Sequence, residues 1–244
     1  GMIFTENLED NSFTLTELQL IEKFPYKRYS RAEDPATGKR MYSVDGTKLP
    51  SVTTILGATK DKESIEALER WKQRVGEDGA EKIKNDAAAM GTEMHLVIEK
   101  YLEGEGYLNI SEKGNRARKM AHTILKNISG LTEVWGNEIS LAFPEKFAGA
   151  TDCIGVIDDK VTIFDWKQTN KPKRREWSAV QDYFTQLGAY SLAHESMYGK
   201  IDQVKICMCS RDFNYQEFSL EGQELKDYQD KWWERFETYL KVTS

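Results

Sequence analysis

Two aspartates and a lysine lie in residues 149–169, GATDCIGVIDDKVTIFDWKQT, among side chains typical of buried strands. Strands of such continuous apolar character are usually buried on both faces, so a carboxylate there is costly unless a cation compensates it. Asp152 and Asp165 supply the oxygen ligands that Mg²⁺ or Mn²⁺ prefers, and Lys167 supplies an ammonium group. We therefore predict a divalent-metal site. A buried Asp–Lys ion pair, with the other aspartate capping a turn, is the alternative explanation.

The spacing of these residues predicts that they converge. Asp158 and Asp159 are expected to form a tight turn, so the two strands run antiparallel and Asp152 can face Asp165. Lys167 follows Asp165 by two positions and shares its face, whereas the residue between them points away. Carboxylates and an ammonium group placed together in this way suit a metal-assisted hydrolase.

The elements that must position these residues can be read along the chain. Residues 26–56 are predicted to be extended, SVTTIL at 51–56 included, with turns at Asp-Pro and Asp-Gly steps. Helical spacing begins at Asp61 and is carried by Ile65, Leu68 and Trp71. Further helices are expected over 79–102, 112–128, 177–198 and the C-terminal segment, and strands over 132–143, 147–158, 160–168, 203–210 and 214–220. This order predicts a mixed α/β fold.

Five motifs in this order resemble the PD-(D/E)xK nuclease superfamily. They are GATD ending at Asp152, DWK ending at Lys167, QLGAY at 186–190, MGTEMH ending at His95, and LPSVTTIL followed by RWKQRVGEDGAEKI. The pattern is similar to the RecB-like branch, which includes the lambda exonuclease type and the mitochondrial genome maintenance exonuclease type. The likeness runs from about residue 42 to residue 190.

The resemblance implies a fold and a set of roles. The fold is an α/β restriction-endonuclease-like core with a mixed central sheet flanked by helices. Residues 1–244 would be one nuclease domain, with an N-terminal hairpin and helical part over 1–130 and the catalytic core over 131–244. The implied metal ligands are His95, Asp152 and Asp165. The implied catalytic residues are Asp152, Asp165, Lys167, Gln186 and Tyr190.

The resemblance also implies a metal-dependent DNA exonuclease that acts at single-stranded ends in replication, recombination or repair. Its cofactor would be Mg²⁺ or Mn²⁺, and its partner would be single-stranded DNA or a duplex with an end. Ser51 and Thr53, in LPSVTTIL, are predicted to contact nucleic acid.

The formal net charge of −6 gives no general attraction to nucleic acid, so binding must come from a local basic patch. The cations that directly follow the DWK strand are predicted to contact DNA phosphates: Lys171, Lys173, Arg174 and Arg175. The alternative to phosphate contact is that these four residues belong to a solvated loop. A second basic cluster lies at 116–119, and the Tyr- and Arg-containing segment 26–42 could stack on single strands or simply form strands.

The roles of three other residues are either undecided or predicted to be structural. Glu138, on the strand before Gly149, could orient a lysine or water, or it could be an ordinary exposed glutamate. His122 and His194 have no matching context and are predicted to be structural.

The composition argues against several classes of protein. There is no apolar run long enough to span a membrane and no signal-like pattern near the N-terminus, so a cytoplasmic protein is expected. Three cysteines without a CxxC pair argue against a disulfide framework, a cysteine zinc site and an iron–sulfur cluster. Two other functions stay open. One is a catalytically silent nucleic-acid-binding module of the same fold, and the other is a paired-carboxylate glycosidase, which would have no use for Lys167.

Overall fold

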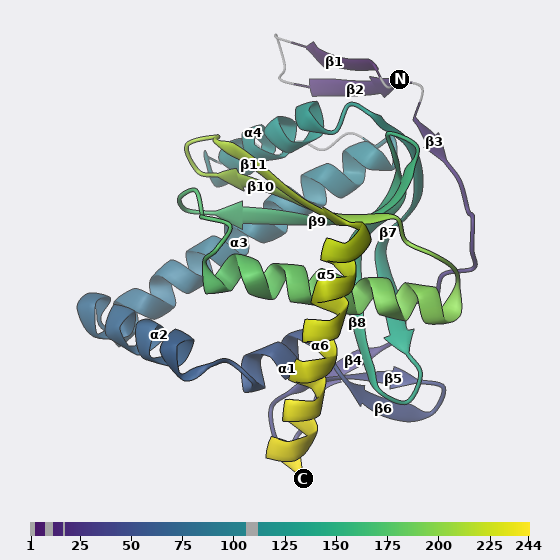
Figure 1. The fold of residues 1–244 in the computed structure, drawn as a ribbon. Helices are drawn as coiled ribbons and strands as arrows, with labels where there is room; N and C mark the ends of the chain where they lie inside the picture. The colour runs from purple at the N-terminus through teal and green to yellow at the C-terminus, as the bar shows by residue number, and fades with distance from the viewer. Residues whose placement is uncertain (1–2, 8–11, 17, 106–111) are drawn as a thin grey trace.

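A mixed six-stranded sheet forms the centre of the fold (Figure 1). The computed structural model describes residues 3–7, 12–16, 18–105 and 112–244. The strands stand in the order β11-β10-β9-β8-β7-β3, with the bounds Tyr215–Glu221, Gln203–Ser210, Lys160–Thr169, Phe147–Ile157, Leu131–Phe143 and Gln19–Leu20. Neighbours from β7 to β9 are antiparallel, whereas β10 is parallel to β9 and antiparallel to β11. The predicted mixed α/β architecture is confirmed.

Turn chemistry and apolar runs explain this sheet. Asp158 and Asp159, between β8 and β9, both have positive φ, at 50° and 63°, as the tight hairpin turn of type I′ requires. Every residue of β10 is buried, which is typical of a central strand with parallel pairing. Parallel strands need a crossover, and α5 (Ser178–Met197) makes the crossover from β9 to β10.

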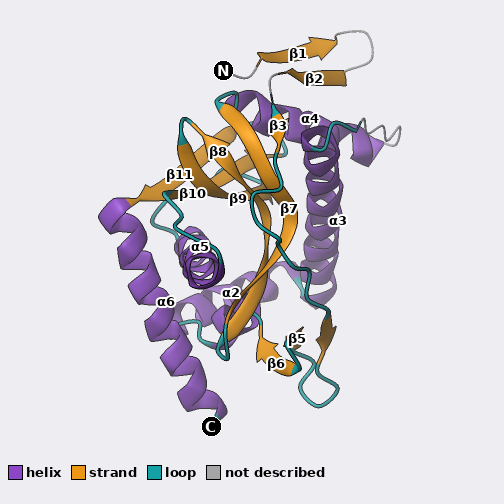
Figure 2. Ribbon diagram, turned by 90° about the vertical axis from the view of Figure 1, so that its right-hand side faces the viewer, coloured by secondary structure: helices purple, strands orange, loops and turns teal. Residues whose placement is uncertain are grey.

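Helices cover both faces of the sheet (Figure 2). On one face α5 packs with α6 (Gly222–Thr243) and the short α1 (Val52–Ala58), around buried side chains that include Phe184 and Trp232. On the other face lie α3 (Glu77–Leu102) and α4 (Glu112–Asn127), whose apolar side chains meet Phe164 and Trp166. The predicted flanking of the sheet by helices is therefore confirmed.

The N-terminal part adds a small sheet beside the start of β8. Its strands are β4 (Arg31–Glu33), β5 (Arg40–Val44) and β6 (Thr47–Pro50), in that order and antiparallel. Asp45 and Gly46 form the expected turn, both with positive φ. A further pair, β1 (Ile3–Asn7) with β2 (Ser12–Thr16), lies at the opposite end of the molecule (Figure 1).

The structure contradicts the prediction that SVTTIL is a strand. Ser51 has extended backbone, and its Oγ accepts a hydrogen bond from the Thr54 N–H at 3.0 Å, which caps α1. An N-cap serine satisfies one of the free N–H groups of the first turn, and the burial of Val52 and Ile55 fixes the helix in place. Capping and packing outweigh the β-propensity of the Val-Thr-Thr run.

The helix predicted from Asp61 is present as α2 (Lys62–Val75), capped by the Asp61 carboxylate. Its apolar residues follow the predicted spacing, but Ile65 and Leu68 remain 50% and 44% exposed. Among the described helices, none is both long and apolar enough to cross a membrane.

Candidate active site

The residues predicted to carry the chemistry line one cavity of about 280 Å³. It contains the predicted metal, catalytic and nucleic-acid residues His95, Asp152, Asp165, Lys167, Gln186, Tyr190, Ser51 and Thr53. Four further polar side chains share the cavity: Arg31, Arg40, Tyr42 and Glu138. The fold thus joins the small N-terminal sheet, α1, α3, α5 and the central strands around one space.

Three carboxylates stand in a row across the central strands. The register of β7 against β8 places Glu138 opposite Asp152, and the register of β8 against β9 places Asp165 next to Asp152. Glu138 has a φ of 51°, a left-handed conformation that costs a non-glycine residue about 1–3 kcal/mol. Such strain inside a strand is typical of residues that a functional site requires.

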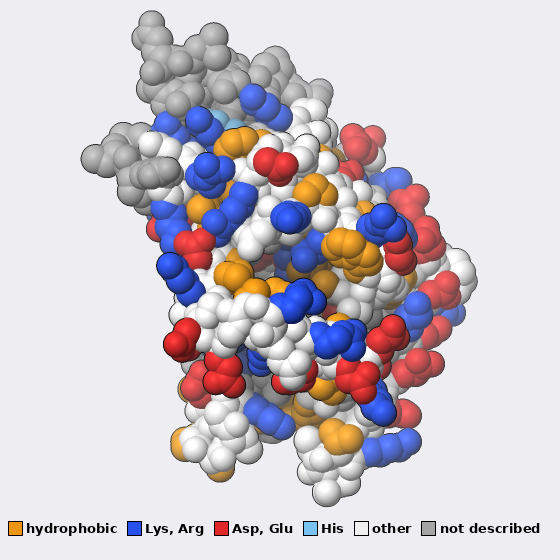
Figure 3. Space-filling model, turned by 90° about the vertical axis from the view of Figure 1, so that its left-hand side faces the viewer, with side chains coloured by type: hydrophobic (Ala, Val, Ile, Leu, Met, Phe, Trp, Pro, Cys, Tyr) orange, Lys and Arg blue, Asp and Glu red, His pale blue; other side chains and the backbone are white. Residues whose placement is uncertain are grey.

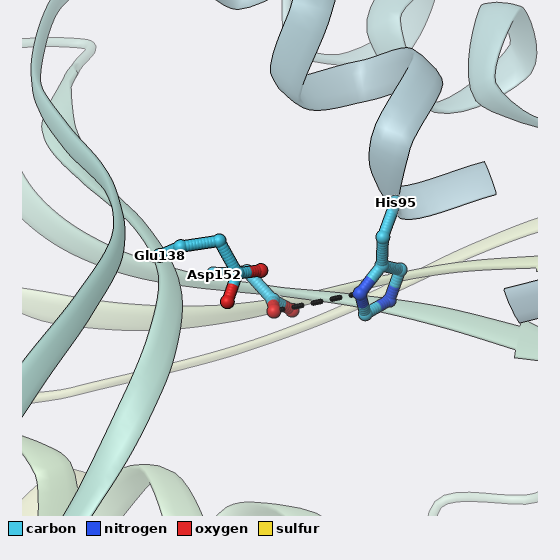
Figure 4. Close-up of side chains that lie close together, drawn as sticks. All are labelled: His95, Glu138 and Asp152. Atoms are coloured by element: carbon cyan, nitrogen blue, oxygen red, sulfur yellow. Dashed lines mark ion pairs between the residues drawn. The ribbon is translucent and has the colours of Figure 1, made fainter. Parts of the chain in front are cut away.

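His95 faces this row from α3. Figure 4 shows its imidazole opposite the side chains of Glu138 and Asp152, which come from the sheet. His95 Nδ1 lies 3.6 Å from Asp152 Oδ1, and His95 Nε2 contacts the carbonyl oxygen of Trp166. A carbonyl only accepts hydrogen bonds, so Nε2 must carry the proton and Nδ1 presents its lone pair to the carboxylates. This is the orientation of a metal-binding histidine.

Burial and neighbouring charges set the protonation of the row. Burial lowers the pKa of His95 below its ordinary value, although Asp165 opposes this, so the imidazole is neutral at pH 7. Burial raises the pKa of the Asp152 carboxyl well above its usual range, and the nearby Asp165 raises it further. The pKa of Glu138 is also raised, by burial and then by Glu99. The site therefore has an excess of closely spaced negative charge.

A divalent cation fits these residues. One nitrogen or oxygen atom each from His95, Glu138 and Asp152 lies within 4.8 Å of the other two. Asp165 Oδ2 is buried and accepts no hydrogen bond within the described residues, although Lys167 Nζ lies 3.0 Å away. One imidazole nitrogen with several carboxylate oxygens is a donor set suited to a hard or borderline divalent ion.

Lys167 completes the charged cluster. Its ammonium pairs with Asp165 and lies over the ring of Tyr183, 4.5 Å from the ring centroid. Burial lowers the pKa of Lys167, but the attraction of Asp165 outweighs it and the net shift is upward, so the group stays charged at pH 7. The backbone N–H of Trp166 donates to Asp152 Oδ2 at 2.8 Å and holds that carboxylate in place.

Gln186 and Tyr190 lie one turn apart on α5, as predicted. Gln186 Nε2 donates to the Tyr190 hydroxyl at 2.9 Å. On α1, Ser51 Oγ lies 3.2 Å from Thr53 Oγ1, in addition to its capping bond. Both hydroxyl residues therefore reach the cavity from the N-terminus of a helix.

The structure does not bring the basic loop, residues 171–175, into the cavity. Arg175 pairs with Glu224 at 3.0 Å, and its guanidinium lies over Phe184 at 4.7 Å. Lys173 exchanges backbone hydrogen bonds with the Gln216 side chain. Lys171 and Arg174 likewise do not line the cavity. The contact of these four residues with DNA stays a prediction.

Sequence reasoning left Glu138 undecided and did not assign Arg31, Arg40 or Tyr42 to the site. A signal for Glu138 was available: the turn at 144–146 joins β7 to β8, and counting back from it pairs position 138 with Asp152. No such signal exists for Arg31 and Arg40, because their sheet reaches β8 through the bridge between Ser51 and Ala148 and through the packing of Tyr42 and Leu49 on Ala148.

The remaining two histidines lie outside the cavity and are buried, at 5% exposure for His122 and 0% for His194. His194 bonds to the Tyr26 hydroxyl at 2.7 Å and to the Gly199 carbonyl at 2.6 Å. These positions agree with the structural role predicted for both.

Comparisons with known proteins find sequence similarity to exonucleases. No protein-family model matches the chain. Mitochondrial genome maintenance exonuclease 1 from Homo sapiens is 29% identical over 151 residues, which cover 58% of this chain and 42% of that protein. Its counterpart from Mus musculus is 32% identical over 132 residues, which cover 51% and 38%. The chain thus spans less than half the length of these relatives.

Among solved structures, an alkaline exonuclease from Laribacter hongkongensis is 17% identical, with a TM-score of 0.29, over 62% of this chain and 82% of that one. The sequence matches are to proteins named as exonucleases, and the chain's own motifs GATD, DWK and QLGAY resemble the PD-(D/E)xK pattern. The chain is accordingly similar in sequence to mitochondrial genome maintenance exonuclease 1, over less than half the length of that protein.

Proposed function

We propose that this protein is a divalent-metal-dependent DNA exonuclease that hydrolyses phosphodiester bonds at single-stranded ends. The observation that carries the proposal is the row of Glu138, Asp152 and Asp165, with His95 and Lys167 beside it in one cavity. The similarity to proteins named as genome maintenance exonucleases supports the choice of substrate, and we propose a role in replication, recombination or repair.

The metal ligands in this proposal are His95, Asp152 and Asp165, as the family pattern implies, together with Glu138 from the observed cluster. Mg²⁺ or Mn²⁺ is the ion proposed, because carboxylate oxygens dominate the donor set. When bound at such a site, a divalent ion activates water and stabilises negative charge on a phosphoryl oxygen.

Residues of the chain itself stabilise the reacting group and support the site. The charged Lys167 ammonium lies beside Asp165, where it can stabilise the negative charge that develops as water attacks phosphorus. The P–O bond to the leaving oxygen then breaks, and this oxygen takes up a proton, which balances the proton that the attacking water releases. Gln186 and Tyr190 support this site through their mutual hydrogen bond.

Phosphates on the approach to the cavity are proposed to contact Ser51, Thr53, Arg31 and Arg40. Figure 3 shows the face of the molecule on which α2 and the start of α5 lie: it is hollowed at its centre, and Lys and Arg side chains gather around the hollow. A local positive surface of this kind can bind a polyanion even though the net charge is −6.

The test is digestion of end-labelled linear DNA, single- and double-stranded, with Mg²⁺, with Mn²⁺ and with EDTA. Circular single strands and linear strands with both ends chemically blocked are the controls. We expect short products from linear single strands with a metal ion only, and none from the circles. The Asp152→Asn protein should be inactive on every substrate.

Other outcomes point to the other functions. Tight DNA binding without cleavage in any metal would identify a silent binding module, and equal cleavage of circles and linear strands would identify an endonuclease. Hydrolysis of aryl glycosides that survives Lys167→Ala would favour a paired-carboxylate glycosidase. The location in the cell, expected to be cytoplasmic from the sequence, stays a prediction.

A further inference from the structure

We infer that Tyr183, on α5, is a positioning residue that holds the Lys167 ammonium at the reacting phosphate through its ring face. The inference rests on the proposed nuclease function, in which Lys167 acts on the reacting phosphate. Lys167 Nζ lies over the Tyr183 ring, 4.5 Å from the centroid, which is the geometry of a cation–π contact. Tyr183 does not line the cavity itself, so it acts from behind the lysine.

A lysine needs such a support because its four-carbon stem is flexible and its rotamer freedom is large. Within the described residues, two contacts hold the ammonium: Asp165 Oδ2 at 3.0 Å and the Tyr183 ring. The Lys167 side chain is 22% exposed, so water weakens the ion pair only in part. The ring comes from a helix that has half of its residues buried in the core, which restricts the movement of the ring.

The two contacts respond differently when a cation binds the carboxylates. A carboxylate that binds a metal ion shares its charge, so it attracts a neighbouring ammonium less strongly. The Tyr183 ring carries no formal charge, and it does not compete for the metal. Tyr183 therefore keeps the lysine in place under the conditions in which Asp165 holds it least.

Helix α5 also connects Tyr183 to the rest of the site. Gln186 follows Tyr183 by three positions and lies on the same side of α5. Gln186 lines the cavity and bonds to Tyr190, so one helix carries the residue behind the lysine and two residues beside the carboxylates. Rotation or displacement of α5 would move all three together.

The first experiment compares Tyr183→Leu with Tyr183→Phe. We expect the Leu variant to lose roughly tenfold in kcat, equivalent to about 1.4 kcal/mol, with little change in KM, while the Phe variant keeps most of the rate. Phenylalanines with one, two and three ring fluorines at this position should lower kcat stepwise, because fluorine withdraws charge from the ring face without changing its packing. This series keeps the test decisive even where the Leu variant folds poorly.

Lys231 and Tyr228, on α6, provide a matched control. Lys231 Nζ lies 4.3 Å from the Tyr228 ring centroid, and neither residue lines the cavity. Tyr228→Leu should lower thermal stability and leave kcat unchanged. An equal loss of kcat in the two Leu variants, or no trend across the fluorinated series, would overturn the inference.

The second readout needs neither metal nor activity. In metal-free protein with ¹³Cε-labelled lysine, the Lys167 methylene should resonate upfield because of the Tyr183 ring current, with the signal assigned by its loss in Lys167→Arg. We expect the upfield shift to survive Tyr183→Phe and to vanish in Tyr183→Leu. A wild-type protein that shows this shift but cleaves no DNA would refute the proposed function and leave the contact standing. Normal cleavage without the shift would refute the contact alone.

Discussion

Gly149 lies directly against the ring of Tyr190: a Cβ at position 149 would stand 2.5 Å from Tyr190 Cε1. This contact gives the glycine of the GATD motif a steric reason. We predict that Gly149→Ala displaces Tyr190 and, through their hydrogen bond, Gln186. The variant should lose about 1–3 kcal/mol of unfolding free energy, as expected for overpacking, together with most of its cleavage rate.

The glycine of MGTEMH provides the control for this prediction. A Cβ at Gly91 would meet Gln168 Cβ at 3.8 Å, an ordinary contact, and the residue lies inside α3. Gly91→Ala should therefore keep activity and raise stability by about 1 kcal/mol through helix propensity. Urea unfolding and single-turnover cleavage of both variants check the pair. Equal tolerance of alanine at the two positions would show that the Tyr190 contact is unimportant.

The second prediction concerns the crowded carboxylates. Asp152→Asn removes one negative charge from the row but keeps an oxygen that can accept the Trp166 N–H. In EDTA we expect Tm to rise above that of the wild type, because repulsion with Asp165 is relieved. Addition of Mn²⁺ should raise Tm in the wild type and have little effect in the variant.

Glu138→Gln should behave in the same way if Glu138 is a ligand, and Glu145→Gln, in the turn after β7, is the matched control with no expected effect. Calorimetric titration with Mn²⁺ measures the affinity directly. Unchanged Mn²⁺ binding in Asp152→Asn and in Asp165→Asn would contradict the assignment of the metal site.

The third prediction concerns acid stability. Burial lowers the pKa of His122 to about 2, with repulsion from Lys126 and Arg118 as smaller causes. The unfolded chain takes up a proton at its ordinary pKa of 6.5, whereas the folded chain does not, so stability falls as the pH drops below about 6.5. The slope from this group alone should approach about 1.4 kcal/mol per pH unit.

His122→Leu cannot take up this proton. The difference in unfolding free energy between variant and wild type should stay constant from pH 7 to 9 and shift in favour of the variant on acidification. Urea denaturation across the pH series measures it, and any constant packing loss cancels from the slope. Two parallel curves down to acid pH would exclude His122 as a source of acid sensitivity.

The fourth prediction separates two basic surfaces. If Arg31 and Arg40 contact phosphates, each contact that is lost should lower the log–log salt slope of single-strand binding by roughly 0.7. Neutralising Lys171, Lys173, Arg174 and Arg175 should also weaken DNA binding and flatten the slope, while turnover at saturating DNA falls much less. Binding measured across a salt series compares the two variants with the wild type. A slope unchanged by the loop variant would mean that the loop is merely solvated.

The sequence predicted the residues that carry the chemistry better than it predicted the other residues that line the cavity. Asp152, Asp165 and Lys167 follow the period of a strand, and one tight turn fixes how the two strands pair, so their meeting could be derived locally. Arg31 and Arg40 lie more than a hundred positions before these residues, on a separate sheet. Contacts of that range depend on packing, which no local pattern contains.

Two other differences have local physical causes. The Val-Thr-Thr run after Ser51 suggests a strand, but a side-chain cap and three buried apolar residues make it a helix. The spacing of Ile65 and Leu68 predicts a helix correctly, yet periodicity does not say whether the apolar face is covered, and both side chains are largely exposed.

The row of carboxylates also affects how the chain reaches its fold. Glu138, Asp152 and Asp165 belong to one continuous stretch, β7 to β9, which folds back on itself at two short turns. Local hairpins of this kind form early and fast, before the α5 crossover brings β10 to the sheet. Like charges are thus forced together while the chain is still largely unfolded. We expect refolding to be slow in EDTA at low ionic strength and faster with Mn²⁺, so that the ion acts as an aid to folding before it acts in catalysis.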